Sequence, residues 1–327
     1  MSANPDSIFE TIAFTLNGES VEALAGESIL QAAQRVGTEI PRLCYTEGLR
    51  ADGNCRACVV EIEGERVLAP SCCRNPTAGM VVHSNNERAQ KSQKLVLELL
   101  LSDMPKQSYR LDNELTQWAA KLGVDAPRFK PRQQPAADFS HPAIAVNLDA
   151  CIQCTRCLRA CRETQVNDVI GLAQRGHLSK IVFDMDDSMG ESSCVACGEC
   201  VEACPTGALS DATGAQLVAA DRKVDSVCPY CGVGCLLSYH VKDDKIIRVE
   251  GRDGPANLSR LCVKGRYGFD YVNHAQRLLK PLIRKPGIEK GMNQYFDPSD
   301  PSKMFREASW EEAMELAVGG LKKIKTE

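Results

Sequence analysis

The chain has 327 residues, of which 43% are hydrophobic, and its 39 Lys and Arg against 43 Asp and Glu give a net charge of −4. A chain of this length can bury a sizeable core, and ordinary domain sizes predict about two to four modules. The slight acidity leaves no general basic field for a nucleic acid or an anionic membrane, so neither is expected as a partner.

The amino terminus, MSANPDSIFETIAF, has no basic leader, no apolar stretch and no twin arginine, so export is not expected. The best apolar run, residues 95–101, is interrupted by Glu98 and is far shorter than the roughly 18 residues of a membrane span. We therefore expect a soluble, cytoplasmic protein.

Residues 1–85 have the pattern of a small α/β module. Short β-rich runs at 12–16, 57–62, 66–68 and 80–83 surround one helical stretch, SILQAAQRVG. Ser28 and Gln31 form a predicted capping box at the start of that helix, and Gly37 ends it. The pattern predicts a compact mixed sheet with one helix packed on it.

Residues 86–142 read as a helical segment followed by a linker. Ser84 and Glu87 offer a second capping box before LVLELLL, and LDNELTQWAAKLG predicts a further helix whose leucines pack on a neighbour. Residues 126–142 hold four prolines and no periodicity. A change of domain is therefore expected there.

Seventeen cysteines dominate the composition, and in a cytosolic chain closely spaced cysteines indicate metal ligands before disulfides. CIQCTRCLRAC at 151–161 and CVACGECVEACP at 194–205 repeat the C-x2-C-x2-C-x3-C spacing of two-cluster ferredoxins. Zinc is the alternative, but it favours pairs of short knuckles over triplets. The fourth cysteine of each run is expected to serve the other run's cluster, which gives two ligand sets: Cys151, Cys154, Cys157 and Cys204; and Cys194, Cys197, Cys200 and Cys161.

Two further cysteine groups flank this repeat. VCPYCGVGC with a distant partner supplies Cys228, Cys231, Cys235 and Cys262, a three-plus-one set for a [4Fe–4S] cluster, with zinc a fairer competitor here. In the first module Cys44, Cys55 and Cys58 are joined by either Cys72 or its neighbour Cys73. The spacing there favours four-thiolate ligation without specifying [2Fe–2S]. Gly48 and Gly53 suit a loop that wraps a cluster closely.

Nothing else in the sequence suggests a catalytic centre. The histidines, at 83, 141, 177, 240 and 274, lack metal-like spacing, and there is no visible nucleophile, phosphate loop or acid–base pair. Near the end, Ser309 and Glu312 cap a predicted amphipathic helix that has no domain of its own to pack on. These features indicate electron transfer in the front part of a longer polypeptide.

The segments CYTEGLRADGNCRACVVEIEGERVLAPSCCRNP, AVNLDACIQCTRCLRAC, VCPYCGVGC and SRLCVKGRYGFDYVNHAQRL together resemble a known family. It is the large (alpha) subunit of cytoplasmic, NAD-dependent, molybdenum- or tungsten-containing formate dehydrogenases. The resemblance covers nearly the whole chain. In that family the last ligand of the first module directly follows Pro-Ser, which selects Cys72 and leaves Cys73 spare.

The resemblance implies a multi-domain α+β architecture. It comprises a β-grasp [2Fe–2S] ferredoxin domain (1–85), a helical segment and Pro-rich linker (86–142), a two-[4Fe–4S] ferredoxin domain (143–220), a small [4Fe–4S] domain (221–285) and the start of a truncated molybdopterin-binding domain (286–327). The implied cofactors are one [2Fe–2S] and three [4Fe–4S] clusters, with a bis-molybdopterin guanine dinucleotide carrying Mo or W in the full-length protein.

The family also implies partners and one further residue. A flavin- and NAD-binding beta subunit and a small [2Fe–2S] gamma subunit are expected, with formate or carbon dioxide as substrate of the full-length enzyme. Lys264, the lysine after Cys262, is expected to lie between cluster and pterin as an electron relay.

Two other assignments compete with formate dehydrogenase. Complex I large subunits and NAD-linked hydrogenases resemble the chain too, but they carry a His-x3-Cys-x2-Cys-x5-Cys site where residues 84–149 here have no cysteine. A freestanding polyferredoxin carrier without catalysis is the third reading.

Overall fold

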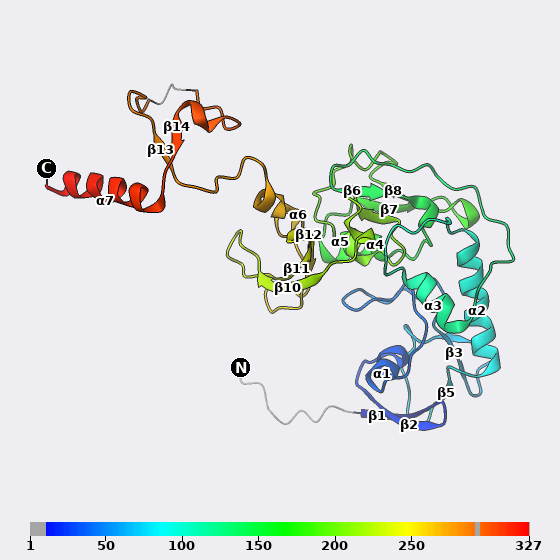
Figure 1. Cartoon of the computed structure of the whole chain (residues 1–327). Coiled ribbons are helices and arrows are strands. Elements are labelled where there is room, and N and C mark those ends of the chain that lie inside the picture. The colour runs from blue at the N-terminus through cyan, green and yellow to red at the C-terminus, as the bar shows by residue number, and fades with distance from the viewer. Residues whose placement is uncertain (1–10, 292–294, 327) are drawn as a thin grey trace. The chain divides into compact units, whose positions relative to one another are not determined.

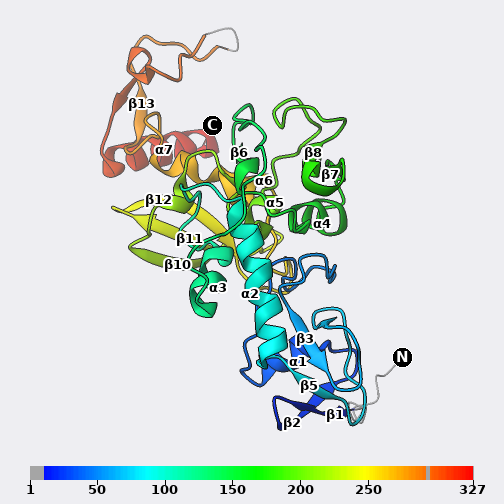
Figure 2. The same cartoon turned by 90° about the vertical axis from the view of Figure 1, so that its right-hand side faces the viewer.

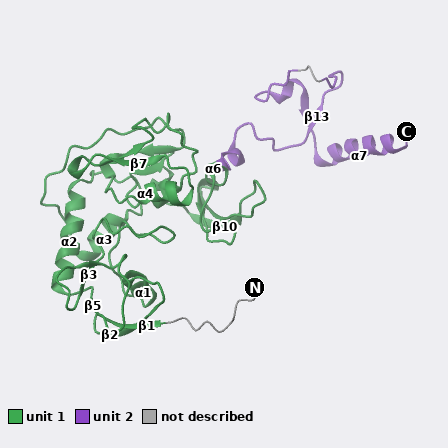
Figure 3. Ribbon diagram, turned by 180° about the vertical axis from the view of Figure 1, so that it is seen from behind, with its two compact units in different colours: residues 1–267 green, residues 268–327 purple. Residues whose placement is uncertain are grey.

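The computed structural model describes residues 11–291 and 295–326. They fall into two compact units that meet between Tyr267 and Gly268, coloured separately in Figure 3. The large first unit contains all seventeen cysteines, and each unit is described by itself.

A five-stranded mixed sheet opens the first unit, in the order β2-β1-β5-β3-β4. Helix α1 packs on it, and both contribute buried apolar side chains to one core. Ser28 and Gln31 form the predicted capping box of α1. The elements are β1 (Thr11–Leu16), β2 (Glu19–Leu24), α1 (Ile29–Arg35), β3 (Val59–Ile62), β4 (Ala69–Pro70) and β5 (Val81–His83).

Two details of this sheet differ from the expectation. The predicted strand at 66–68 is wrong, because these residues form a bend before β4 and the carbonyl of Arg66 accepts a hydrogen bond from Arg88 at 2.6 Å. Strand β2 was not predicted, because only Val21 and Ala23 of its six residues are buried and its outer face carries Glu19 and Glu22. Pairing with β1 makes this polar segment a strand.

Two helices follow, α2 (Glu87–Ser102) and α3 (Glu114–Leu122), which lie side by side, with α2 next to β3 (Figure 2). The expected capping box at Ser84 and Glu87 is wrong: Asn86 caps α2 by accepting from Ala89 N, and Ser84 Oγ instead accepts from Asn17 Nδ2 at 2.8 Å. Leu97 of α2 and Leu115 of α3 are fully buried in a shared cluster. That cluster includes Leu43 of the first module, which ties the helices to the cysteine-bearing loop.

The repeated cysteine runs lie in a region built from two short hairpin-like sheets and small helices (Figure 1). β6 pairs with β9 and β7 with β8, all antiparallel. The elements are β6 (Ile144–Val146), η1 (Leu148–Ala150), α4 (Arg156–Arg159), η2 (Ala160–Thr164), β7 (Ile170–Ala173), η3 (Gly176–Leu178), β8 (Lys180–Phe183), α5 (Glu199–Ala203), β9 (Leu209–Asp211) and η4 (Ala215–Leu217).

The first unit ends with a three-stranded antiparallel meander of β10 (Arg222–Val227), β11 (Leu236–Lys242) and β12 (Lys245–Gly251), followed by α6 (Val263–Tyr267). The loop between β10 and β11 carries three of the cysteines, and its ends are joined by a Cys228 N to Cys235 O hydrogen bond of 2.8 Å.

The second unit is small. Its antiparallel pair β13–β14 precedes helix α7, which Ser309 caps through Glu312 N at 3.2 Å, as predicted. None of the described residues of α7 is buried. The elements are η5 (Gly268–Asn273), β13 (Leu282–Arg284), η6 (Pro301–Lys303), β14 (Phe305–Glu307) and α7 (Trp310–Thr326). No helix among the described residues is long and apolar enough to cross a membrane.

Candidate iron–sulfur sites

The first group of thiols, the Cys44 group, consists of Cys44, Cys55, Cys58 and Cys72. Hydrogen bonds connect these side chains: from Cys55 and Cys72 to Cys44, and from Cys72 to Cys58. Two members come from the loop after α1 and the others from the ends of β3 and β4, so the sheet brings together cysteines that are far apart in sequence. Three of the four are buried, and Cys55 is half-buried.

These contacts split the acidities of the four thiols. The bond from Cys55 holds the pKa of Cys44 at about 2, and the bond from Cys72 holds the pKa of Cys58 at about 7. The same contacts with Cys44 raise the pKa of Cys55 and of Cys72. Thiols this close repel each other once several are ionised, so the group needs positive charge in its middle.

Cys73 stands apart from this group. Its side chain is exposed, its sulfur lies 3.6 Å from that of Cys72, and a Cβ on Gly53 would approach that sulfur to 2.8 Å. Because Gly53 also has a φ of +63°, the turn beside Cys73 favours glycine.

The structure brings Cys151, Cys154 and Cys157 together with Cys204 around one hollow, the Cys151 group. A separate hollow is lined by Cys194, Cys197 and Cys200 together with Cys161, the Cys194 group. The fourth thiol of each set comes from the opposite run, the arrangement that the repeated spacing predicts. Their binding of iron stays a proposal.

The two runs share one backbone geometry. Gln153 and Thr155 in the first run, and Ala196 and Gly198 in the second, have positive φ angles between 54° and 76°. These turns aim backbone N–H groups at sulfur: Gln153 N donates to Cys151 Sγ at 3.4 Å and Ala196 N to Cys194 Sγ at 3.3 Å. Such hydrogen bonds to ligand sulfur tune a cluster's potential.

Burial governs the acidities in both sets. Desolvation raises the pKa of Cys151 to about 11 and of Cys154 to about 12, and it raises those of Cys157 and Cys200 well above the ordinary range. A buried thiolate needs a positive counter-charge, and iron supplies one. Sets of four thiols around apolar hollows therefore fit a thiolate-bound cluster. In the described part of the chain, no group of three or more His, Cys, Asp or Glu side chains converges on a single metal ion.

The Cys228 group is more open. Cys228 and Cys235 are half-buried, whereas Cys231 and Cys262 are exposed. Burial, reinforced by the three other thiols, raises the pKa of Cys235, which places the four side chains near one another. The predicted relay, Lys264, is exposed on α6, two residues after Cys262.

A buried guanidinium joins the Cys44 and Cys151 groups. Arg159 of α4 donates to the carbonyl of Cys44 at 2.6 Å, to that of Cys154 at 3.1 Å and to that of Arg50. Its neighbour Arg156 pairs with Glu114 at 2.8 Å and donates to the carbonyl of Leu43 at 3.2 Å. The loop that follows α1 is therefore held against the first cysteine run.

A second buried guanidinium joins the Cys194 and Cys228 groups. Arg266 of α6 donates to the carbonyl of Cys197 at 2.9 Å and pairs with Glu199 and, at 2.9 Å, with Glu202. Glu199 also accepts from Leu261 N at 2.9 Å. A Cβ on Gly198 would approach Arg266 Cδ to 2.2 Å, so this junction needs glycine there.

Sequence reasoning missed these arginines. The available signal was their position: Arg156 and Arg159 lie between cysteines of the first run, and Arg266 lies four residues after Cys262. Position alone does not say that they are buried or what they contact.

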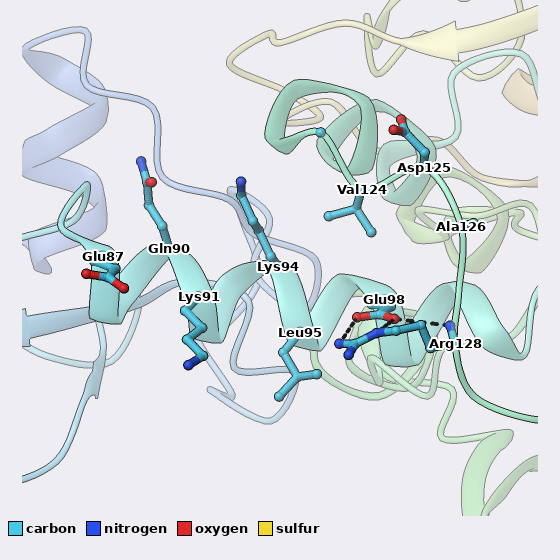
Figure 4. Close-up of a pocket in the computed structure, with 11 residues that line it drawn as sticks. Glu87, Gln90, Lys91, Lys94, Leu95, Glu98, Val124, Asp125, Ala126 and Arg128 are labelled. Carbon is cyan, nitrogen blue, oxygen red and sulfur yellow. Dashed lines mark hydrogen bonds and ion pairs between the residues drawn. The ribbon is translucent and has the colours of Figure 1, made fainter.

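The largest surface hollow has no connection to the cysteines. It lies between α2 and residues 123–128, where Glu98 is ion-paired with Arg128 (Figure 4). Its other lining groups are mostly charged and solvent-facing, and none is a nucleophile or a cysteine. It presents no chemistry of its own.

The histidines do not form a metal site with one another. His83 contacts Glu63 at 2.9 Å and His240 contacts Glu250 at 2.8 Å, whereas His141 accepts from the backbone N–H groups of Ala143 and Ile144.

Comparison with known proteins identifies the same three regions. Residues 10–87 match a 2Fe-2S iron–sulfur cluster binding domain, residues 141–210 the ferredoxin-like domain of NADH-quinone oxidoreductase subunit 3, and residues 221–274 the molybdopterin oxidoreductase Fe4S4 domain. The chain is therefore a multi-domain α+β protein with a [2Fe–2S] ferredoxin domain, a ferredoxin-like [4Fe–4S] domain and a molybdopterin-type Fe4S4 domain, which confirms the predicted fold class.

Whole-chain relatives are distant and longer. The chain is 34% identical over 290 residues to the G 2 subunit of NADH-quinone oxidoreductase from Rhizobium meliloti, covering 84% of this chain and 33% of that protein. It is 29% identical to putative formate dehydrogenase YrhE of Bacillus subtilis, covering 97% of this chain and 36% of that one. A solved NAD+-reducing [NiFe]-hydrogenase chain is 29% identical with a TM-score of 0.57, over 61% of this chain and 87% of that one.

The chain spans about a third of the length of these curated relatives. It corresponds to the iron–sulfur electron-transfer portion of the large subunits of the formate dehydrogenase, NADH-quinone oxidoreductase G and NAD-reducing hydrogenase group of oxidoreductases.

Proposed function

We propose that this chain is the electron-transfer portion of the alpha subunit of a cytoplasmic, NAD-dependent molybdenum or tungsten formate dehydrogenase. One observation carries the proposal: the four cysteine groups form a connected series within one compact unit. Arg266 joins the Cys228 group to the Cys194 group, the exchanged cysteines interlock the Cys194 and Cys151 groups, and Arg159 joins the Cys151 group to the Cys44 group.

The series has chemically different ends. At one end is the Fe4S4 domain of the molybdopterin oxidoreductase type, and at the other the [2Fe–2S] domain. When bound, one [2Fe–2S] and three [4Fe–4S] clusters supply one-electron transfer without proton movement. The chain's own residues hold each cluster by four thiolates, exclude water at the Cys151 and Cys194 groups through burial, and fix the contacts between neighbouring groups.

Formate is the proposed electron source. Putative formate dehydrogenases from Bacillus and Staphylococcus align with 97% of this chain. Residues 84–149 contain no cysteine, so they offer no thiolates for an additional cluster between the first and second domains. The full-length enzyme would oxidise formate, or reduce carbon dioxide, at a bis-molybdopterin guanine dinucleotide. Electrons would leave toward a flavin- and NAD-binding beta subunit and a small [2Fe–2S] gamma subunit.

A second candidate is a hydrogenase or complex I-like subunit. It is favoured by the 34% identity to the NADH-quinone oxidoreductase relative from Rhizobium meliloti and by the structural likeness to the NAD+-reducing hydrogenase. It predicts that hydrogen or quinone exchanges electrons with the clusters.

One experiment separates the candidates. The assembled enzyme is purified anaerobically, its clusters are oxidised, and formate or hydrogen is added while electron paramagnetic resonance follows cluster reduction. Reduction by formate with NAD+ as final acceptor supports the proposal. Reduction by hydrogen, or exchange with quinone but not with formate, would select the second candidate, and no reduction by any donor would leave a polyferredoxin carrier.

Lys264 is proposed as the relay between the Cys228 cluster and the pterin, because it is the exposed lysine next to Cys262 on α6. Lys264→Ala in the assembled enzyme should slow formate turnover and leave iron and sulfide content intact. Lys245→Ala, at an exposed lysine that opens β12, is the matched control. Equal turnover of the two variants would remove this role from Lys264.

A further inference from the structure

Arg159 is one of the most deeply buried side chains of the chain, with 1% of its side chain exposed, yet it lies between two domains. Its guanidinium donates to carbonyls of two predicted ligand residues, Cys44 in the first domain and Cys154 in the second. We propose that Arg159 is a positioning residue that holds the Cys44 and Cys151 clusters in register and raises the reduction potentials of both. The inference rests on the proposed function, since it needs both clusters to be present.

The charge of Arg159 is poorly compensated by side chains. Its one carboxylate neighbour, Asp52, lies 4.0 Å from Nε, and this nitrogen is buried without a hydrogen-bond partner. Asp52 itself is shared with Thr155 at 2.7 Å, with Asn54 at 3.3 Å and with Arg50 at 3.4 Å.

The other buried arginines differ in this respect. Arg156, with 5% of its side chain exposed, faces both oxygens of Glu114 at 2.8 Å. Arg266, with 2% exposed, faces two glutamates. A buried cation without a counter-charge is strongly unfavourable, so Arg159 needs negative charge from another source. Clusters held by four thiolates carry net negative charge, and thiolate groups lie on both sides of Arg159.

The contacts also explain why the residue is an arginine. The guanidinium is a rigid planar fork, so one side chain reaches carbonyls of both ligand loops in a fixed geometry. A lysine could supply the charge but not the fork. The hydrogen bonds of Arg159 thus fix the separation of two ligand loops, and its charge favours the reduced form of a cluster on either side.

The electron step itself is simple to balance. One electron leaves the reduced cluster of the Cys151 group and one enters the oxidised cluster of the Cys44 group, with no bond made or broken and no proton transferred. A positive charge close to both clusters stabilises the more negative, reduced state of each, so it raises both potentials.

The test is a redox titration of the full chain, loaded with its clusters under anaerobic conditions and followed by electron paramagnetic resonance. The signals of the [2Fe–2S] and [4Fe–4S] clusters are separated by their temperature dependence. Arg159→Met should lower the potentials of the Cys44 and Cys151 clusters, whereas that of the Cys228 cluster stays in place as an internal reference. Arg159→Lys should restore most of the potential but weaken the magnetic interaction between the two reduced clusters, because the fork is lost.

Asp52→Asn gives a shift of opposite sign. It removes the nearest carboxylate and keeps Arg159, so both potentials should rise. This variant tests the charge effect even if Arg159→Met does not assemble. The matched control is the double variant Arg156→Met with Glu114→Gln, which removes a buried arginine from the same helix as a neutral pair and should leave both potentials unchanged.

Several results would overturn the inference. These are unchanged potentials in a fully assembled Arg159→Met chain, an equal shift of every cluster including the reference, or no upward shift in Asp52→Asn. If the unmodified chain carries zinc or shows no cluster signals, the proposed function fails first and the inference fails with it. Shifted potentials in a chain that formate does not reduce would uphold the role of Arg159 and overturn formate oxidation alone.

Discussion

The junction between α5 and α6 offers a prediction with a calculable size. Arg266→Met would leave Glu199 and Glu202, whose side chains are 10% and 24% exposed, without their counter-charge. It would also leave the carbonyl of Cys197 without its 2.9 Å donor. Breaking a buried ion pair from one side costs about 3–5 kcal/mol. Since about 1.4 kcal/mol corresponds to a factor of ten, local opening should become about 100- to 1000-fold more frequent.

Hydrogen exchange in the full chain measures this opening directly. The amide of Leu261, which donates to Glu199, and that of Arg266, which donates to Cys262, should exchange faster by that factor, whereas α1 serves as an internal reference. Adding Glu199→Gln and Glu202→Gln should recover part of the protection, because no uncompensated charge then remains.

Arg162→Met is the control, since Arg162 and its partner Asp168 are 51% and 61% exposed and such a surface pair contributes about 0–1 kcal/mol. Unchanged protection of residues 261–267 in Arg266→Met, or an equal loss in Arg162→Met, would refute the reasoning.

Three further outcomes are expected. Cys161→Ser should abolish the spectrum of the Cys194 cluster; a loss confined to the Cys151 cluster would contradict the exchanged fourth ligands. Cys72→Ser should abolish the [2Fe–2S] spectrum and Cys73→Ser should leave it intact, and the reverse pattern would make Cys73 the ligand. Glu250, whose pKa is held at about 2 chiefly by its contact with His240, stabilises β10–β12 above its ordinary value of 4.5, and this contribution is lost as the pH falls toward 2. Hydrogen exchange of these strands between pH 6 and 3 should show a smaller acid-induced loss in Glu250→Gln than in the unmodified chain.

The cysteine pattern was informative from sequence because it is mostly local. Three thiols of each run lie on one tight loop, and the structure brings to each loop the same remote thiol that the spacing suggested. Binding of iron by these sets stays a prediction. The capping box at Ser28 was equally local and is confirmed.

What could not be predicted depends on long-range contacts. Ser84 was expected to cap a helix, but its hydroxyl is taken by Asn17, 67 residues earlier, and Asn86 caps instead. Arg159 reaches Cys44 across 115 residues and Arg266 reaches Cys197 across 69. No local pattern distinguishes such an arginine from one in solvent. Strand β2 was missed for a related reason: its pairing with β1 outweighs its polar composition.

The uneven burial of the thiols sets an order of vulnerability to air. Cys157 and Cys200 are buried behind apolar side chains, whereas Cys231 and Cys262 face solvent. Dioxygen and chelators reach exposed sulfur first. When this chain is handled in air, bleaching should begin at the loop between β10 and β11 and proceed inward, with the interlocked pair of sites the last to lose iron.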